Sequence, residues 1–87
     1  MGAESPLKFP CDFPIKAMGR VSDDFCRLVI GIVRRHAPDL DEATLRIQES
    51  RSGRYQSVTL TVRATSRRQL DAIYRDLAAC ERVVMAL

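Results

Sequence analysis

The sequence predicts an α+β domain whose elements follow in the order βαββαβ. Three observations support this fold class. Residues 55–64 alternate apolar and polar side chains in the strongest two-residue period of the chain. Residues 22–36 and 66–82 instead repeat their apolar side chains at helical spacing. A chain of 87 residues has room for one small hydrophobic core and no second one.

The first strand is predicted over residues 13–19, where "FPIKAMG" alternates apolar positions with polar or mixed ones. The first helix follows over residues 22–36, with Ser22 as its predicted N-cap. Its apolar stripe consists of Phe25, Leu28, Val29, Ile32 and Val33. Pro38 ends this helix because proline lacks the amide hydrogen that a helix interior needs.

Two strands joined by a hairpin are predicted next, over residues 44–49 and 55–64. In the first of them, Leu45 and Ile47 share the face that we expect to be buried. In the second, the residues expected to face the helices are Val58, Leu60 and Val62, and those expected to face outward are Thr59 and Thr61. In the connecting turn, "ESRSGR", Gly53 is the residue expected to adopt a positive φ.

The second helix begins at a capping box, Ser66 followed three residues later by Gln69, and ends at Glu81 and Arg82. Its apolar stripe consists of Leu70, Ile73, Tyr74 and Leu77. A final strand, "VVMAL", is predicted over residues 83–87 and is apolar on both faces. Strict alternation puts Val83, Met85 and Leu87 on one of these faces and Val84 and Ala86 on the other.

This order predicts the ferredoxin-like split βαβ fold, a four-stranded antiparallel sheet in the order 4-1-3-2 with both helices on one face. We expect residues 1–8 to form a flexible polar leader and residues 9–87 to form the single domain. In this fold the 50–54 hairpin and the end of the first strand lie at one end of the molecule. The end of the first helix and the start of the second lie at the other.

Composition places the chain among soluble globular proteins, with 46% hydrophobic and 29% charged residues. It has no apolar run near the roughly 18 residues that a bilayer requires. The leader "MGAESPLK" lacks the apolar stretch of a signal peptide, so we expect a cytoplasmic protein without membrane contact. Three cysteines without C-x-x-C spacing, Cys11, Cys26 and Cys80, are expected to be reduced thiols.

Catalytic and metal-binding patterns are missing from the sequence. His36 is the single histidine, so it has no histidine partner for a metal site, and no serine or cysteine stands beside it as in a triad. We expect it to cap or pack the end of the first helix, with a pH or ligand role as the alternative. The acidic groups at 23–24 and 39–42 lack the calcium-loop spacing. We therefore expect no enzyme activity, no metal and no cofactor.

A candidate binding surface lies where the first strand turns towards the first helix. Gly19 marks this point and either makes a simple turn or lets a ligand approach the backbone. The "SGRY" turn of the hairpin lies at the same end of the predicted fold. The candidate residues for a small-molecule or partner contact are Lys16, Met18, Gly19, Arg54, Tyr55 and Ser57.

Nucleic-acid binding is the alternative function, because the RNA-recognition motif shares the βαββαβ order and the chain is basic, with a net charge of +3. The candidate contacts are Arg34, Arg35, Arg63, Arg67 and Arg68, which the predicted fold gathers at one end. Such modules stack bases on aromatic side chains of their central strands. Only Tyr55 offers one here, so we rank this function second.

Three segments together, "FPCDFPIKAMG", "RRHAPDL" and "SGRYQSVTLTV", resemble the YbeD-like family of small bacterial proteins of unknown function. The positions that carry the resemblance are Phe9, Pro10, Phe13, Lys16, Met18, Gly19, His36, Pro38, Gly53, Tyr55, Ser57 and Val58. The resemblance implies a cytoplasmic ferredoxin-like domain that looks like the regulatory ACT domains of metabolic enzymes but stands alone. It brings no catalytic residues with it.

These observations predict a non-catalytic regulatory or protein-interaction module whose partner is an unknown protein or a small molecule. The apolar strand at 83–87 is expected to lie at a sheet edge, where unpaired backbone groups invite another chain. We therefore expect weak homodimerisation through this strand. The alternative is that residues 1–12, with Leu7 and Phe9, fold over the strand and cover it.

Overall fold

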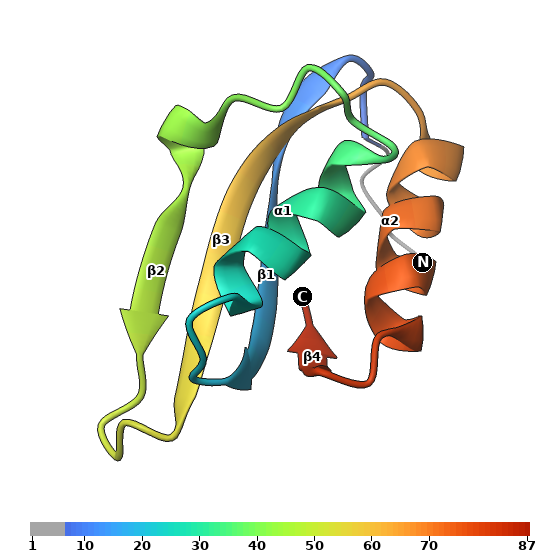
Figure 1. Ribbon diagram of the computed structural model, residues 1–87. Helices are drawn as coiled ribbons and strands as arrows, with labels where there is room; N and C mark the ends of the chain where they lie inside the picture. Colours follow the sequence, from blue (N-terminus) through green and yellow to red (C-terminus); the bar gives the residue numbers. More distant parts are fainter. Residues whose placement is uncertain (1–6) are drawn as a thin grey trace, which may run out of the picture.

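The computed structural model describes residues 7–87. Its elements are β1 (Cys11–Arg20), α1 (Phe25–Arg34), a 3-10 turn (Glu42–Thr44), β2 (Arg46–Glu49), β3 (Tyr55–Ala64), α2 (Arg67–Ala79) and β4 (Val83–Ala86). The strands form one antiparallel sheet in the order β2-β3-β1-β4, and both helices lie over one face of it (Figure 1). The predicted ferredoxin-like fold is thus confirmed. Within the described part of the chain, no helix is long and apolar enough to cross a membrane.

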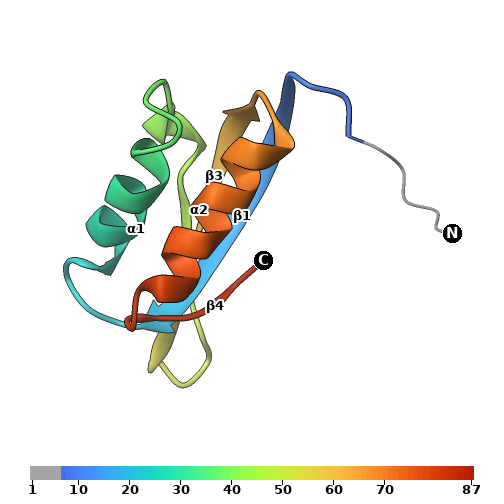
Figure 2. The same cartoon turned by 90° about the vertical axis from the view of Figure 1, so that its right-hand side faces the viewer.

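The two ends of the molecule are arranged as the sequence predicts. The hairpin between β2 and β3, the end of β1 and the end of α2 lie together at one end, and the start of α2 and the start of β1 lie at the other (Figures 1 and 2). Gly53 in the hairpin has φ 77°, the left-handed conformation expected of it. This arrangement brings the β2–β3 hairpin next to the segment that follows β1, where the Val21 amide donates a hydrogen bond to the Arg54 carbonyl oxygen.

The core lies between the helices and the sheet. Val58, Leu60 and Val62 of β3 are fully buried against the helices, whereas Thr59 and Thr61 face the opposite side, as predicted. The largest buried side chains are Phe25, Ile15, Leu60, Ile73 and Leu77. Each such side chain contributes about 1.5–3 kcal/mol by leaving water. The alternating apolar residues of the strands and the apolar stripes of the two helices therefore form one core.

Of the two residues expected on the buried face of the second strand, only Leu45, which lies just before β2, packs partly against the core. All four residues of this strand are exposed, and Ile47 is 52% exposed although it lies on the helix side of the sheet. The two helices lie over the other strands and leave β2 uncovered at the sheet edge (Figure 1). The strand also begins later than predicted, because Glu42–Thr44 form a 3-10 turn capped by the Asp41 side chain.

The two helices begin differently. Ser22 is not the N-cap of α1 as predicted: Asp24 holds that position, and the Ser22 hydroxyl donates a hydrogen bond to its carboxylate. In α2 the predicted cap is confirmed, because the Ser66 hydroxyl accepts a hydrogen bond from the Gln69 amide at 3.1 Å. The Gln69 side chain accepts from the Thr65 amide at 2.8 Å, one residue earlier than in a standard capping box.

The predicted faces of β4 are wrong because a bulge interrupts its alternation. Met18 and Gly19 are adjacent in β1, but their partners in β4, Met85 and Val83, are two residues apart. Val84 is therefore an extra residue in β4 without a partner in β1. Val83 and Ala86 consequently pack against the core. Val84, Met85 and Leu87 remain 64%, 50% and 62% exposed.

The β4 side of β1 is only partly paired. Lys16 exchanges two backbone hydrogen bonds with Leu87, so the backbone groups of Lys16 face β4. The backbone groups of β1 alternate in direction, so those of Pro14 and Asp12 point to the same side as those of Lys16. Both residues lie beyond Leu87, where the pairing with β4 ends. Proline has no amide hydrogen, and it is tolerated at such an unpaired edge position because no ladder hydrogen bond is lost there.

The predicted leader falls mostly on residues 1–6, which lie outside the described residues. Of the remainder, Leu7 and Phe9 are partly buried and pack against the core. They precede the Cys11 end of β1, whereas β4 pairs with the opposite end of that strand. Residues 7–9 therefore leave the exposed side chains of β4 uncovered.

Gly19 holds three elements in close contact. A Cβ atom built on Gly19 would lie 2.5 Å from the Arg82 carbonyl oxygen and 2.5 Å from the Phe25 ring. The end of β1, the start of α1 and the turn before β4 thus meet at a position with no space for a side chain.

We expect Gly19→Ala to destabilise the fold by about 1–3 kcal/mol, because the added methyl group overpacks this contact. The matched control is Gly31→Ala, since a Cβ at that exposed helical position would meet no atom of residues 7–87 within 4 Å apart from its chain neighbours and the nearby backbone of α1. It should be neutral or stabilising by up to about 1 kcal/mol. Urea denaturation measures both, and equal stability of the two variants would contradict the proposed role of Gly19.

Candidate functional site

The sheet face that the helices leave uncovered is the candidate binding surface, here called the open face. Strand register assigns its side chains, because residues on one strand alternate between the two faces. They are Arg46 and Gln48 of β2, the odd-numbered residues 55–63 of β3, the even-numbered residues 12–20 of β1, and Met85 and Leu87 at β4. Hydroxyl groups occupy the middle of this face, and apolar side chains occupy its β4 side.

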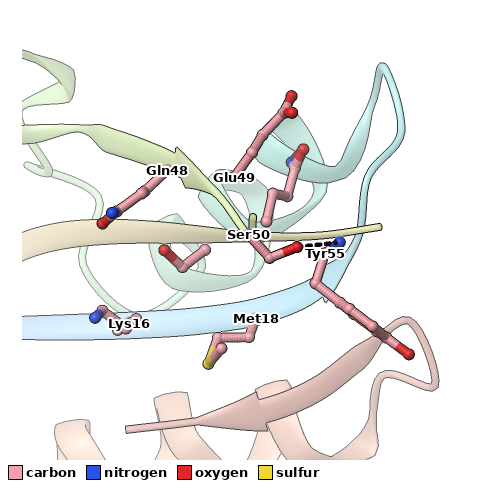
Figure 3. Close-up of a pocket in the computed structure, with 8 residues that line it drawn as sticks. Lys16, Met18, Gln48, Glu49, Ser50 and Tyr55 are labelled. Carbon is pink, nitrogen blue, oxygen red and sulfur yellow. Dashed lines mark hydrogen bonds between the residues drawn. The ribbon is translucent and has the colours of Figure 1, made fainter. Parts of the chain in front are cut away.

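A shallow pocket of about 220 Å³ lies on the open face beside the hairpin (Figure 3). Its lining consists of Lys16, Met18, Gln48, Glu49, Ser50, Tyr55, Gln56 and Ser57. Register turns the side chains of Glu49 and Gln56 towards the opposite face. The Ser50 hydroxyl accepts a hydrogen bond from the Tyr55 amide at 3.2 Å, which fixes the rim of the pocket.

The structure brings together four of the six side chains predicted for this site: Lys16, Met18, Tyr55 and Ser57 all line the pocket. Gly19 lies on the helix side of β1, where it faces Phe25. Arg54 lies in the hairpin, where its carbonyl oxygen accepts a hydrogen bond from the Val21 amide at 2.9 Å. Sequence reasoning missed Gln48 and Ser50, which only the register of the β2–β3 hairpin could have identified.

An ion-pair network closes the end of the molecule next to the pocket. Arg82 donates to both carboxylate oxygens of Asp24, at 2.6 and 3.0 Å, and to the Ser22 hydroxyl at 2.6 Å. The hydrogen bonds that Asp24 accepts, first from Arg82 and then from the Ser22 hydroxyl, lower its pKa from 3.8 to about 2. On the adjoining open face, the Arg20 guanidinium lies 5.9 Å from the centre of the Tyr55 ring, within cation–π range.

His36 joins the two helices. Its Nε2 atom lies 2.7 Å from Oδ2 of Asp76 on α2, and its carbonyl oxygen accepts a hydrogen bond from the Gln69 side chain at 2.8 Å. Arg35 approaches the same Asp76 oxygen at 3.4 Å. The hydrogen bond from His36 lowers the pKa of the Asp76 carboxyl group. These contacts tie the segment after α1 to α2.

The five arginines proposed for nucleic-acid contact do not form a cluster of unpaired cations. Arg34 contacts Glu42 at 2.8 Å, Arg35 contacts Asp76 at 3.4 Å, and Arg63 contacts Asp12 at 3.4 Å. Arg67 and Arg68 stand exposed in the first turn of α2. Carboxylates thus compete with phosphate for three of the five, which weakens the alternative function.

The three cysteines are free thiols, each partly buried against the core. Burial raises the pKa of Cys26, which lies beside Ile30 and Leu45 in a groove between α1 and the segment 42–45 that precedes β2. A raised pKa disfavours the thiolate that nucleophilic chemistry needs. In residues 7–87 no three His, Cys, Asp or Glu side chains gather as metal ligands.

Comparisons with known proteins identify relatives along the whole domain. A family described as "Protein of unknown function (DUF493)" matches residues 4–87. A UPF0250 protein of Nitrosomonas europaea is 47% identical over 87 residues, covering 100% of both chains. A UPF0250 protein of Azotobacter vinelandii is 48% identical over 82 residues, covering 93% of this chain and 89% of that one.

A solved structure with a similar fold comes from H. pylori. The solution structure of protein HP0495 from H. pylori superposes with a TM-score of 0.73, covering 97% of this chain and 88% of that chain. Its sequence identity is 10%, so the likeness shows the ferredoxin-like fold alone.

We expect the Asp24–Arg82 pair to make stability depend on acid. Because the folded pKa of Asp24 is lowered, the stabilisation is fully present above the unfolded value of 3.8 and is lost as the pH falls towards about 2. Asp24→Asn should lower stability at neutral pH and flatten this acid dependence. Asp23→Asn is the control, since Asp23 forms no ion pair within residues 7–87. Urea midpoints across this pH interval test the pair, and parallel curves for all three proteins would exclude its contribution.

Proposed function

Since the chain belongs to the DUF493 family of proteins of unknown function, we propose from its own surface that it is a non-catalytic regulatory module that binds another protein. One observation carries this proposal. Three apolar side chains at the edge of the sheet are each at least half exposed: Val84 and Met85 of β4, and Leu87 directly after it. We call these three residues the β4 strip.

The β4 strip continues onto the open face. Met85 pairs with Met18 across the strands, and Leu87 pairs with Lys16. Contiguous exposed apolar groups at a sheet edge favour contact with another chain, because association removes both the apolar surface and the unpaired edge from water. Methionine suits such a surface because its flexible thioether adapts to varied partners.

A side chain of a protein partner fits the pocket on the open face better than a small molecule does. The pocket at Met18 and Tyr55 measures about 220 Å³, below the roughly 300–1,000 Å³ of typical ligand sites. It is large enough for one side chain of a partner. The raised pKa of Cys26 supports a non-catalytic role, because it disfavours the thiolate that nucleophilic chemistry needs.

The simplest partner is a second copy, bound weakly through β4. Lys16 and Leu87 exchange backbone hydrogen bonds, so alternation turns the backbone groups of Ala86 away from β1. Antiparallel pairing of two β4 strands would satisfy these groups and bring the two β4 strips together. A four-residue strand offers few such bonds, so we expect weak association only.

We expect Val84→Lys to weaken both self-association and partner capture, because it puts a charge into the β4 strip. Ile47→Lys is the matched control, since Ile47 is 52% exposed on the opposite edge strand. Sedimentation velocity over a range of concentrations measures self-association, and cross-linking in cells followed by pull-down measures partner capture. The proposal fails if the wild-type chain stays monomeric and all three proteins recover the same partners in equal amounts.

A further inference from the structure

We propose that the open face binds an acidic amphipathic helix of a partner protein. This inference rests on the proposed function and names the chemistry of the partner. It is carried by the charge of the open face, by the apolar groups beside that charge, and by the one-sided covering of the sheet.

The charges on the open face are unbalanced. Register turns four cations towards this face: Lys16 and Arg20 of β1, Arg46 of β2 and Arg63 of β3. The single carboxylate on the same strand positions is Asp12, which contacts Arg63 at 3.4 Å. The other three cations form no ion pair with any carboxylate of residues 7–87. An acidic partner would supply the missing counter-charges.

Apolar groups lie directly beside these cations. Leu87 pairs with Lys16, and Met85 pairs with Met18, so the β4 side of the open face is apolar while the β1 and β2 strands carry the charge. An amphipathic helix with an apolar stripe flanked by carboxylates is complementary to this surface, because it also has an apolar part next to a charged part. Its apolar stripe would cover the β4 strip and Met18, and its carboxylates would reach Lys16 and Arg46.

A helix also fits the layers of the fold. Both helices of the chain lie on one face of the sheet, and a third helix on the open face would complete a sandwich with helices on both sides. The pocket between Met18, Gln48 and Tyr55 would accept one anchoring side chain (Figure 3).

Nucleic acid is the competing occupant of a positive sheet face. It needs aromatic rings on which bases stack, and Tyr55 is the one aromatic side chain that register assigns to the open face. Arg20 lies over its ring at 5.9 Å. Aliphatic and thioether groups occupy the neighbouring positions, and these suit the apolar side chains of a protein.

The test uses a synthetic amphipathic helix with a leucine stripe flanked by glutamates, a version with lysines in place of the glutamates, and a single-stranded oligonucleotide. Fluorescence anisotropy measures binding of each to the full chain, and backbone amide NMR locates it. We expect the acidic peptide to bind, with shifts centred on Lys16, Met18 and Met85, and the lysine peptide not to bind. Affinity for the acidic peptide should fall as salt is raised.

The double variant Lys16→Glu/Arg46→Glu should weaken binding of the acidic peptide about tenfold. Arg27→Glu/Arg75→Glu is the matched control, because these exposed arginines lie on the helices. Urea denaturation checks that both variants fold, and Lys16→Gln/Arg46→Gln replaces the first pair if they do not. Equal effects of the two double variants would overturn the inference, as would the absence of peptide binding or tighter binding of the oligonucleotide.

The two proposals fail separately. If Val84→Lys abolishes partner capture while Lys16→Glu/Arg46→Glu leaves it unchanged, the chain is an interaction module whose partner is not acidic. Loss of partner capture in both variants supports both proposals.

Discussion

The structure depends on one geometric constraint: two helices of 10 and 13 residues cover a single face of a four-stranded sheet. The alternating residues of β3 divide accordingly, with Val58, Leu60 and Val62 in the core and the threonines on the opposite side. The same limit leaves β2 bare at one edge and the β4 strip exposed at the other. The candidate site is therefore the part of the sheet that α1 and α2 leave uncovered within residues 7–87.

Sequence reasoning recovered what local periodicity determines. The strand alternation at 55–64 and the two helical stripes were sufficient to predict the element order, and the order predicts the sheet topology. The predictions failed where a residue's burial, face or capping depends on contacts with segments distant in the sequence. Burial of β2 depends on where the helices lie, the faces of β4 depend on a bulge opposite Gly19, and the cap of α1 involves Asp24, which is bound by Arg82 from 58 residues away.

The candidate site was predictable in part for the same reason. Lys16, Met18, Tyr55 and Ser57 share a face because their strands pair in the predicted order. Gly19 follows Met18 directly and so points to the other face, where its missing side chain serves packing. Gln48 could be assigned to the site only from the register of the β2–β3 hairpin. The charge imbalance of the open face could be recognised only from the ion pairs, which show which cations contact a carboxylate and which do not.

Pro14 has a consequence for how far any assembly of this domain can grow. A strand added along the part of β1 that β4 leaves unpaired reaches Pro14, whose nitrogen carries no hydrogen for the next bond of the ladder. The added strand would therefore end after a few residues and could not template a long intermolecular sheet. The outer edge of β4 is limited separately, because that strand is four residues long. Both open stretches on this side of the sheet are thus too short for fibril formation, a hazard to which long, regular edge strands are prone.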